Sequence, residues 1–328
     1  MPVSHMKLHR SLLAVAAAAA VAPAALADPF LVRNQNPLLT PFGLPNPLPA
    51  RLPQAGGSRL SANLHWGSAS YDELNGEDGF VVDGEMLELR LRYERSLGPR
   101  LALLVELPWR RTWEGELDQF IDEFHDLTGL PGGSRGQLPQ DRLLIEALSG
   151  GETLYLFDQP GSGIGDIPLG LGYQLVATPD TALSAWLSLK APVGDADELT
   201  GSGAADVSLS LAGERALGGQ LRLFAQADVT FLGEGDLLPA LQEDVVWSGM
   251  AGFSWNSWRA LDLTAQVAAN SRVFDATGAL AGDAVVLVFG GTWRTAGGWR
   301  LDVSVSEDVD VNASPDVVFN FGLSRDLR

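Results

Sequence analysis

Hydrophobic and polar residues alternate with a period of two along most of the chain after Leu60. A period of two sends successive side chains to opposite faces of a β-strand. The segment 87–94 reads LELRLRYE, so one of its faces is apolar and the other is charged throughout. A soluble sheet rarely needs these two faces, whereas a strand between lipid and a polar interior needs both.

Twelve segments share this alternation, and we expect each to be a strand. They are residues 60–66, 87–94, 103–109, 167–173, 183–189, 207–211, 221–231, 245–255, 261–267, 285–293, 299–305 and 317–323. The pattern predicts an all-β fold: an antiparallel up-and-down transmembrane β-barrel of about twelve strands, occupying residues 58–328.

The connections between these segments alternate in length. The short ones cover residues 97–100, 178–181, 217–220, 256–259 and 295–298, and the long ones cover residues 70–84, 112–163, 192–205, 233–244, 274–283 and 307–316. Outer-membrane barrels have short periplasmic turns and longer outer loops. We therefore expect a protein of the Gram-negative outer membrane with both termini in the periplasm. An exported β-sandwich is the runner-up, and the systematic shortness of alternate loops disfavours it.

The N-terminal segment, residues 1–27, has the pattern of a secretory signal peptide. Lys7 and Arg10 precede an apolar run, and an Ala-Leu-Ala triplet ends at residue 27, where we expect cleavage. Residues 28–57, here called the leader, contain seven prolines, which exclude a regular helix and a central strand. The leader is either an extended plug that enters the periplasmic mouth or a solvated linker.

One segment of the longest loop has helical spacing. Its apolar residues recur three and four positions apart before Gly129, at Leu117, Phe120, Ile121, Phe124 and Leu127. This spacing predicts a short helix that either covers the outer mouth or packs on other loops, and we favour the first. The candidate residues for closing the lumen at its mouths are Arg33, Asn34, Phe120, Phe124 and His125.

If the apolar faces meet lipid, the opposite faces line the lumen. The lumen candidates are Glu88, Arg90, Arg92, Glu94, Glu106, Arg110, Asp166, Lys190, Asp206, Arg222, Asp228, Arg294 and Arg300. Charges of both signs either pair structurally or set the selectivity of a pore, and pairing is the favoured role. On this facing, Leu89→Arg and Leu187→Arg are each expected to cost about 2–4 kcal/mol and Glu88→Ala less.

The chain has 41 acidic and 22 basic residues, a formal charge of −19 and no cysteine. This charge argues against a nucleic-acid partner, and thiolate chemistry is excluded. The long loops are acidic, with Arg135 and Arg142 as their only basic residues. Solubility explains these loops best, and divalent cations that bridge them to anionic lipid are the alternative. We assign no catalytic residue, no protein-bound metal and no cofactor.

Several motifs resemble known outer-membrane proteins. RNQNPL at 33–38, GLP at 43–45, FIDEFH at 120–125 and GLP at 129–131 resemble a family of Gram-negative outer-membrane β-barrels classed only as a domain of unknown function, over the whole mature chain. The shorter motifs GIGD at 163–166, KAPVGD at 190–195 and GSGAAD at 201–206 resemble barrels for uptake of aromatic or hydrophobic compounds. The resemblance implies location and architecture, and no activity.

We expect an integral outer-membrane barrel that is a passive conduit or binding site for a small, hydrophobic molecule rather than an enzyme. The main alternative is a structural or surface-interaction barrel that contacts outer-membrane lipid or a partner without transport. A barrel enzyme acting on lipid would need His65 or His125 within hydrogen-bond reach of a serine and an acid.

Overall fold

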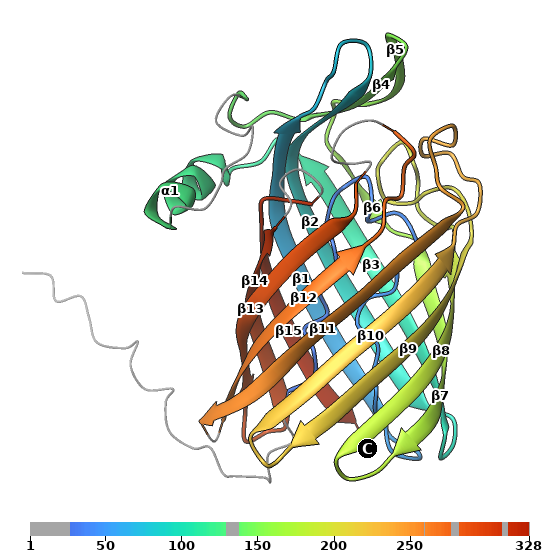
Figure 1. Ribbon diagram of the computed structural model, residues 1–328, viewed down its shortest axis with the longest axis vertical. Helices are drawn as coiled ribbons and strands as arrows, with labels where there is room; N and C mark the ends of the chain where they lie inside the picture. Colours follow the sequence, from blue (N-terminus) through green and yellow to red (C-terminus); the bar gives the residue numbers. More distant parts are fainter. Residues whose placement is uncertain (1–26, 129–137, 259, 277–281, 310–313, 328) are drawn as a thin grey trace, which may run out of the picture.

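Twelve long antiparallel strands close into a barrel in the computed structural model, as the alternation predicts (Figure 1). The structure describes residues 27–128, 138–258, 260–276, 282–309 and 314–327. The barrel strands are β1 (Ser58–Asp72), β2 (Gly79–Ser96), β3 (Leu101–Trp113), β7 (Ile167–Ala177), β8 (Thr181–Ala191), β9 (Asp206–Leu217), β10 (Leu221–Phe231), β11 (Val245–Trp258), β12 (Leu261–Asn270), β13 (Ala284–Arg294), β14 (Trp299–Asp308) and β15 (Val317–Leu327). Neighbours in the chain pair with each other, and β1 pairs with β15 to close the sheet.

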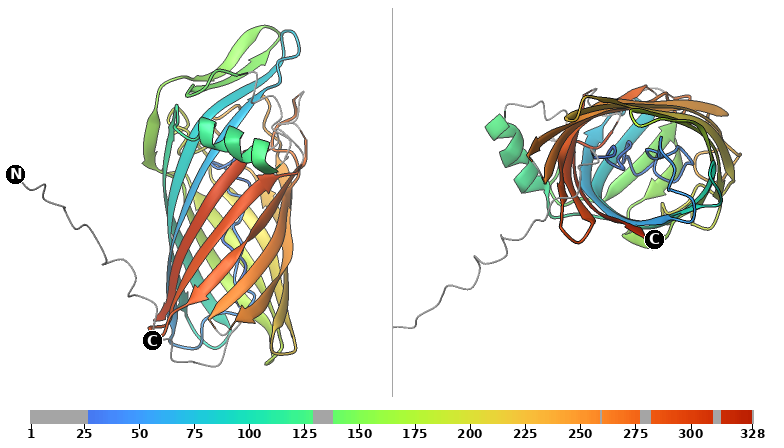
Figure 2. Two further views of the ribbon diagram at one scale, coloured as in Figure 1. Left: turned by 90° about the vertical axis from the view of Figure 1, so that its left-hand side faces the viewer. Right: turned by 90° about the horizontal axis from the view of Figure 1, so that it is seen from below.

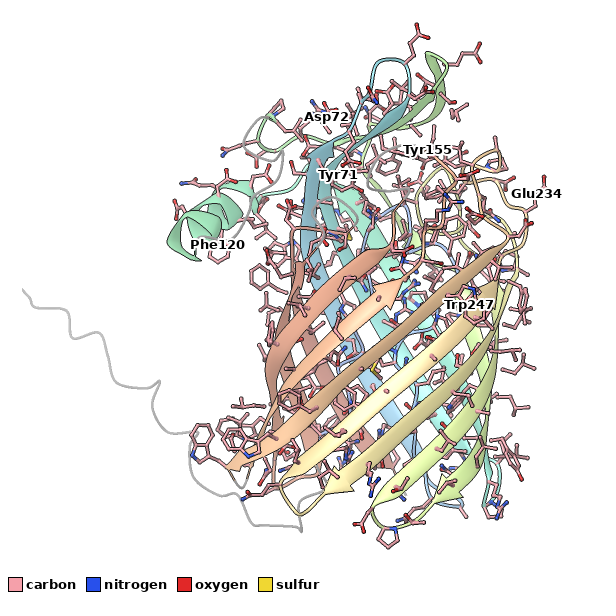
Figure 3. All side chains as sticks on the ribbon, in the orientation of Figure 1. Tyr71, Asp72, Phe120, Tyr155, Glu234 and Trp247 are labelled. Atoms are coloured by element: carbon pink, nitrogen blue, oxygen red, sulfur yellow. The ribbon has the colours of Figure 1, made fainter. Side chains whose placement is uncertain are left out.

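The apolar faces point outward and the polar faces point inward. Leu89 and Leu91 on β2 are 38% and 43% exposed, whereas Arg90 and Arg92 between them are 1% exposed. Large aromatic side chains such as Trp247 also lie exposed on the outer surface (Figure 3). This inversion of a soluble protein's pattern fits a barrel whose outer surface meets lipid.

The outer end of the barrel differs from the expected loops. Residues 70–84 are not a long loop, because β1 and β2 continue as a paired hairpin up to Asp72 and Val81. The loop after β3 forms three strands that the alternation did not predict: β4 (Leu144–Ser149), β5 (Glu152–Phe157) and β6 (Gly161–Ile164). β4 pairs with the part of β2 that extends beyond β3, and β6 pairs with the part of β3 that extends beyond β7. Both parts would otherwise have an unpaired strand edge.

The predicted loop helix forms as α1 (Asp118–Thr128). It lies beside the barrel rather than over the outer mouth, so its favoured placement was wrong (Figure 2). Ile121 of α1 packs on Val317 of β15, and the Phe120 and Phe319 rings meet edge to face with centroids 5.9 Å apart. Within the described residues, no helix is long and apolar enough to span a bilayer.

The remaining sequence predictions in these regions fall outside the described part. The signal-peptide residues 1–26, Gly129 and the second GLP motif are not described, and neither are the side chains of Phe124 and His125.

Candidate functional site: a lumen filled by the leader

The leader runs inside the barrel as a two-limbed strap (Figure 2). We call residues 28–36 its ascending limb and residues 43–52 its descending limb, joined by a turn at residues 37–42. The direction of each limb follows from its contacts with strands whose own directions are known. Most leader residues from 34 to 50 are buried.

The ascending limb follows β12 from its end at the short turns towards its end at the long loops. Gln266 Oε1 accepts the N–H of Phe30 at 3.0 Å, and Gln266 Nε2 donates to the carbonyl of the same residue at 3.2 Å. Higher on β12, the Asn34 amide donates to Asn270 Oδ1 at 3.4 Å. The Phe30 side chain packs in a small cluster with Val286 and Val288 of β13.

The descending limb returns along β9, β10 and β7. The N–H of Gly43 donates to Asp206 near the outer end of β9 at 2.7 Å. The N–H of Leu48 donates to Gln226 Oε1 at mid-strand at 2.6 Å. The N–H of Leu52 donates to Gln174 Oε1 near the short-turn end of β7 at 2.8 Å. The leader therefore enters and leaves through the mouth that carries the short turns.

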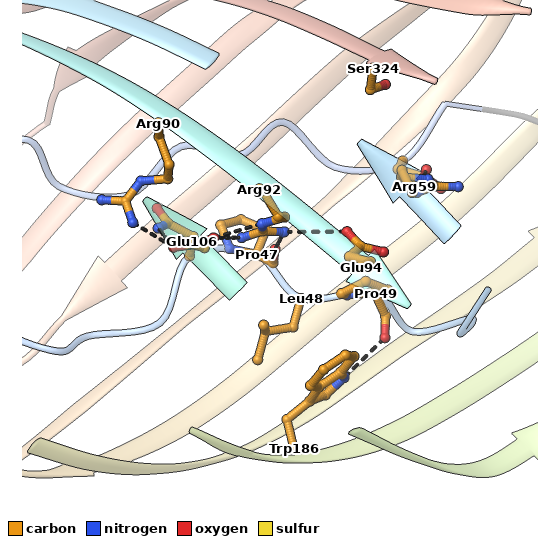
Figure 4. Close-up of polar contacts among 12 residues, drawn as sticks. Pro47, Leu48, Pro49, Arg59, Arg90, Arg92, Glu94, Glu106, Trp186 and Ser324 are labelled. Atoms are coloured by element: carbon orange, nitrogen blue, oxygen red, sulfur yellow. Dashed lines mark hydrogen bonds and ion pairs between the residues drawn. The ribbon is translucent and has the colours of Figure 1, made fainter. Parts of the chain in front are cut away.

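A ladder of buried charges on β2 and β3 faces this limb (Figure 4). Arg90 contacts Glu88 at 2.7 Å and Glu106 at 2.5 Å, and Arg92 Nε donates to Glu106 at 2.6 Å. Arg110 closes the ladder on Glu88 at 2.8 Å, and Glu94 lies 4.0 Å from Arg92. In this conformation the lumen charges pair with one another, which is the arrangement that burial of ions requires.

Lys190, the only lysine after the predicted signal peptide, joins the leader to the outer loops. Its Nζ lies 2.7 Å from Asp166 and 3.0 Å from Asp206, and donates to the Pro41 carbonyl at 3.0 Å. Asp206 also accepts the N–H of Gly233, and Asp166 accepts those of Val193, Gly194 and Ser202. The turn of the leader and two outer connections thus share one ion cluster.

The basic lumen candidates nearest the short turns also form ion pairs. Asp28 contacts Arg59 at 2.7 Å and Arg222 at 3.1 Å. Burial alone would raise the pKa of Asp28, but Arg59, Arg300 and Arg222 together lower it to about 2. A cavity of about 700 Å³ opens at this mouth beside Asp28, Arg222 and Arg300.

Three other lumen and mouth candidates have partners elsewhere. Arg294 donates to Asp262 at 3.1 Å. Asp228 accepts from Gln226 at 2.9 Å and from Ser248 at 3.2 Å. Arg33 contacts its own leader, donating to the Thr40 carbonyl at 2.8 Å, and so braces the turn.

An apolar cluster fills the lumen at the outer mouth. It joins the leader turn to strands and outer loops, and its largest members include Leu38, Phe42, Tyr71, Phe80, Phe157, Leu199, Leu237 and Phe274. Tyr71 of β1 lies at this level and accepts a hydrogen bond from Asn36 at 2.6 Å (Figure 3). Apart from the cavity at the short-turn mouth, three cavities beside the leader measure about 60, 30 and 20 Å³, enough for isolated waters but not for a solute.

The structure adds lumen residues that sequence reasoning missed. Gln174 and Gln226 were not among the candidates, although each is an inward position in an alternating strand. An amide that can both donate and accept, placed inside a barrel, was the available signal.

The geometry offers little for hydrolysis or metal binding. His65 Nδ1 lies 2.7 Å from Asn320 Oδ1, and Nε2 has no hydrogen-bond partner within the described part of the chain. The Ser-His-acid arrangement is therefore not formed at His65. Across the described ranges, no group of three or more His, Asp or Glu is arranged to hold a metal ion.

Solved structures with similar folds include an outer-membrane channel. The COG4313 outer membrane channel from Pseudomonas putida F1 superposes with a TM-score of 0.54 at 14% identity, covering 84% of this chain and 97% of that one. The toluene transporter TodX from P. putida gives 0.40 at 14% identity (89% and 92% covered), and the CymD monoaromatic hydrocarbon channel gives 0.42 at 11% (91% and 94%). At 14% identity the likeness to the first structure supports the fold alone.

Sequence comparison adds the family. Among curated proteins no match is found. A family model described as "Protein of unknown function (DUF3187)" matches residues 6–326. The chain therefore belongs to the DUF3187 family.

Proposed function

We propose that this protein is an outer-membrane channel for a small solute with apolar groups, closed in this conformation by its own leader. Both termini lie on the periplasmic side, and the outward belt of leucine and tryptophan contacts outer-membrane lipid. One observation carries the proposal: the leader occupies the lumen without belonging to the sheet. The sheet closes through the pairing of β1 with β15, and the leader contributes no strand to it.

The way in which the leader is held favours exchange with solvent. Its limbs make hydrogen bonds with lumen side chains: Gln266 donates to the Phe30 carbonyl and Gln226 accepts from the Leu48 N–H. Their apolar side chains also pack in small clusters on the wall. Water replaces such bonds at a net cost of about 0.5–1.5 kcal/mol each, far less than the cost of breaking the barrel. Departure of the leader would expose the polar wall and leave a hydrophilic path.

Planar-bilayer conductance tests this function. Purified full-length protein is compared with a chain lacking residues 28–57, each shown to be folded by its heat-dependent gel mobility. We expect larger or more frequent current steps after the deletion. The matched control removes residues 118–128, because α1 lies outside the barrel, and its conductance should equal that of the full-length protein.

Silence from the folded deletion variant would refute the channel and favour a structural or surface-interaction barrel. The apolar cluster that joins the outer loops to the leader turn supports this second function, since it makes a rigid outer face. Current in the α1 deletion that matches the leader deletion would contradict the assignment of closure to the leader.

A further inference from the structure

Three buried glutamines on three different strands hold the backbone of the leader. Gln226 accepts from the N–H of Leu48 at 2.6 Å and donates to the Asn46 carbonyl at 3.3 Å. Gln174 repeats this four residues later, accepting from Leu52 at 2.8 Å and donating to the Ala50 carbonyl at 2.8 Å. Gln266 binds the N–H and carbonyl of Phe30 on the other limb.

Two of these glutamines also make hydrogen bonds with the barrel itself. Gln226 Nε2 contacts Asp228, and Gln174 Nε2 contacts the carbonyls of Val176 and Leu183. With the leader in place, Gln174, Gln226 and Gln266 are 6%, 6% and 3% exposed. The amides are therefore held in orientations that match a chain in the lumen.

Other lumen side chains extend the same kind of recognition. Arg92 donates to the Pro47 carbonyl at 2.8 Å, and Ser184 and Trp186 donate to the Pro49 carbonyl at 2.6 and 3.1 Å (Figure 4). Each bond is made to a backbone carbonyl, a group that every residue possesses. The contact is therefore with an extended chain more than with particular side chains.

The wall under the descending limb suits small and medium apolar side chains. Leu48, Ala50 and Leu52 pack on a floor whose members are Ala102, Leu104, Ala182, Trp186 and Ala212. The small alanine side chains leave room for leader side chains the size of leucine. Proline at residues 45, 47 and 49 removes backbone N–H groups that would need partners here. A segment rich in proline and leucine therefore packs against this wall and leaves few backbone N–H groups without an acceptor.

We propose that the lumen is a binding site for extended polypeptide, and that the solute which replaces the leader is a short peptide rich in proline and leucine-sized residues. This inference rests on the proposed channel function, which it makes more specific. The leader, as part of the same chain, occupies the site that a separate peptide occupies once the leader has left.

Peptide binding to the barrel lacking residues 28–57 tests the proposal. The probes are three fluorescent peptides: residues 43–54 (GLPNPLPARLPQ), a scrambled sequence of the same composition, and residues 118–128 (DQFIDEFHDLT). Fluorescence anisotropy is measured on folded protein in detergent. We expect the first two peptides to bind with dissociation constants within about threefold of each other, and the helix peptide not to bind.

Glutamine variants locate the site. Gln174→Met, Gln226→Met and Gln266→Met keep side-chain size but remove both amide contacts. Gln174→Met and Gln226→Met should each weaken binding of the 43–54 peptide about tenfold. Gln266 contacts the other limb, so Gln266→Met is tested with a fourth probe, a fluorescent peptide of residues 28–36, whose binding should weaken by the same factor. Ser254→Ala is the control, since Ser254 is buried and pairs with Thr264 rather than the leader.

Three results would overturn the proposal: no binding by the 43–54 peptide, binding by that peptide but not its scrambled form, or unchanged affinity in the glutamine variants. The second result would make the leader a sequence-specific plug. Because anisotropy does not need a current, failure of peptide binding is distinguishable from failure of conduction. A barrel that conducts but binds no peptide would retain the channel function and lose its peptide solute.

Discussion

The leader and α1 were the two candidate segments for closing the lumen, and the structure places them on opposite sides of the barrel wall (Figures 1 and 2). The leader lies inside, among polar side chains. α1 lies outside, where Ile121 packs on Val317 and the carboxylate of Glu85 accepts the N–H of Glu116 just before the helix.

Backbone hydrogen bonding explains the difference. An extended, proline-rich chain forms no internal ladder, so its N–H and carbonyl groups need outside partners, and a polar lumen supplies them. A helix satisfies its own backbone and needs only a surface for its apolar stripe. The outward face of β15 is such a surface, whereas the lumen wall is polar.

The largest expected effect comes from breaking the polar lumen that holds the leader. Glu88 is 3% exposed and contacts Arg90 and Arg110. Glu88→Ala should lower the free energy of unfolding by about 3–5 kcal/mol, because buried Arg110 loses its carboxylate partner and Arg90 keeps only Glu106. This revises the milder effect expected from the alternation alone. Denaturant unfolding in vesicles measures it, and a loss below that of Leu187→Arg would contradict the ladder.

A slightly smaller effect is expected on the outer surface that receives α1. Leu187 is 49% exposed at mid-strand in β8. Leu187→Arg should cost about 2–4 kcal/mol through burial of a charge in lipid. The same unfolding assay applies, with Leu187→Ile as the control. Equal stability of the Leu187→Arg and Leu187→Ile variants would contradict the assignment of Leu187 to the lipid-facing surface.

A local effect is expected at α1. Phe120 is 52% exposed and meets Phe319 edge to face. Phe120→Ala should weaken helix docking by about 1 kcal/mol, since an aromatic pair contributes about 0.5–1.5 kcal/mol. Protease cleavage between residues 113 and 144 should become several-fold faster while conductance stays unchanged. A change in conductance would place α1 in the closure of the lumen.

The smallest effect is expected from pH at the lower end of the leader. The arginines that lower the pKa of Asp28 to about 2 keep its ion pairs intact at ordinary pH. A lowered pKa stabilises the folded form above the ordinary value of 3.8, and that contribution disappears as pH falls towards 2. Conductance of the full-length protein should therefore be the same at pH 8 and pH 5. Opening between these values would contradict this.

Strands on the lipid face were predictable from sequence because lipid on one side and polar atoms on the other impose a strict period of two. β4 and β6 were not, since they pair only with the outer ends of β2 and β3, beyond the barrel. The longest loop gave a correct helix but a wrong position, because helical spacing identifies an apolar stripe and not its partner.

The lumen site was predictable only as a set of inward charges. Which residues contact depends on pairs such as Leu48 with Gln226, which are 178 residues apart in the chain. Only the closed barrel brings them together. The leader's proline content excluded helix and strand, but it could not distinguish a strap in the lumen from a linker in solvent.

Disulfide cross-linking in outer membranes tests the threaded leader most directly. A Cβ built on Gly43 would lie 2.8 Å from Asp206 Cβ, close to the 3.5–4.5 Å of a disulfide after a small shift. The chain has no native cysteine. Gly43→Cys with Asp206→Cys should cross-link on mild oxidation, whereas Gly43→Cys with Phe319→Cys, which lies outside beside α1, should not. Absence of the first cross-link, or equal yields from both pairs, would contradict a leader inside the barrel.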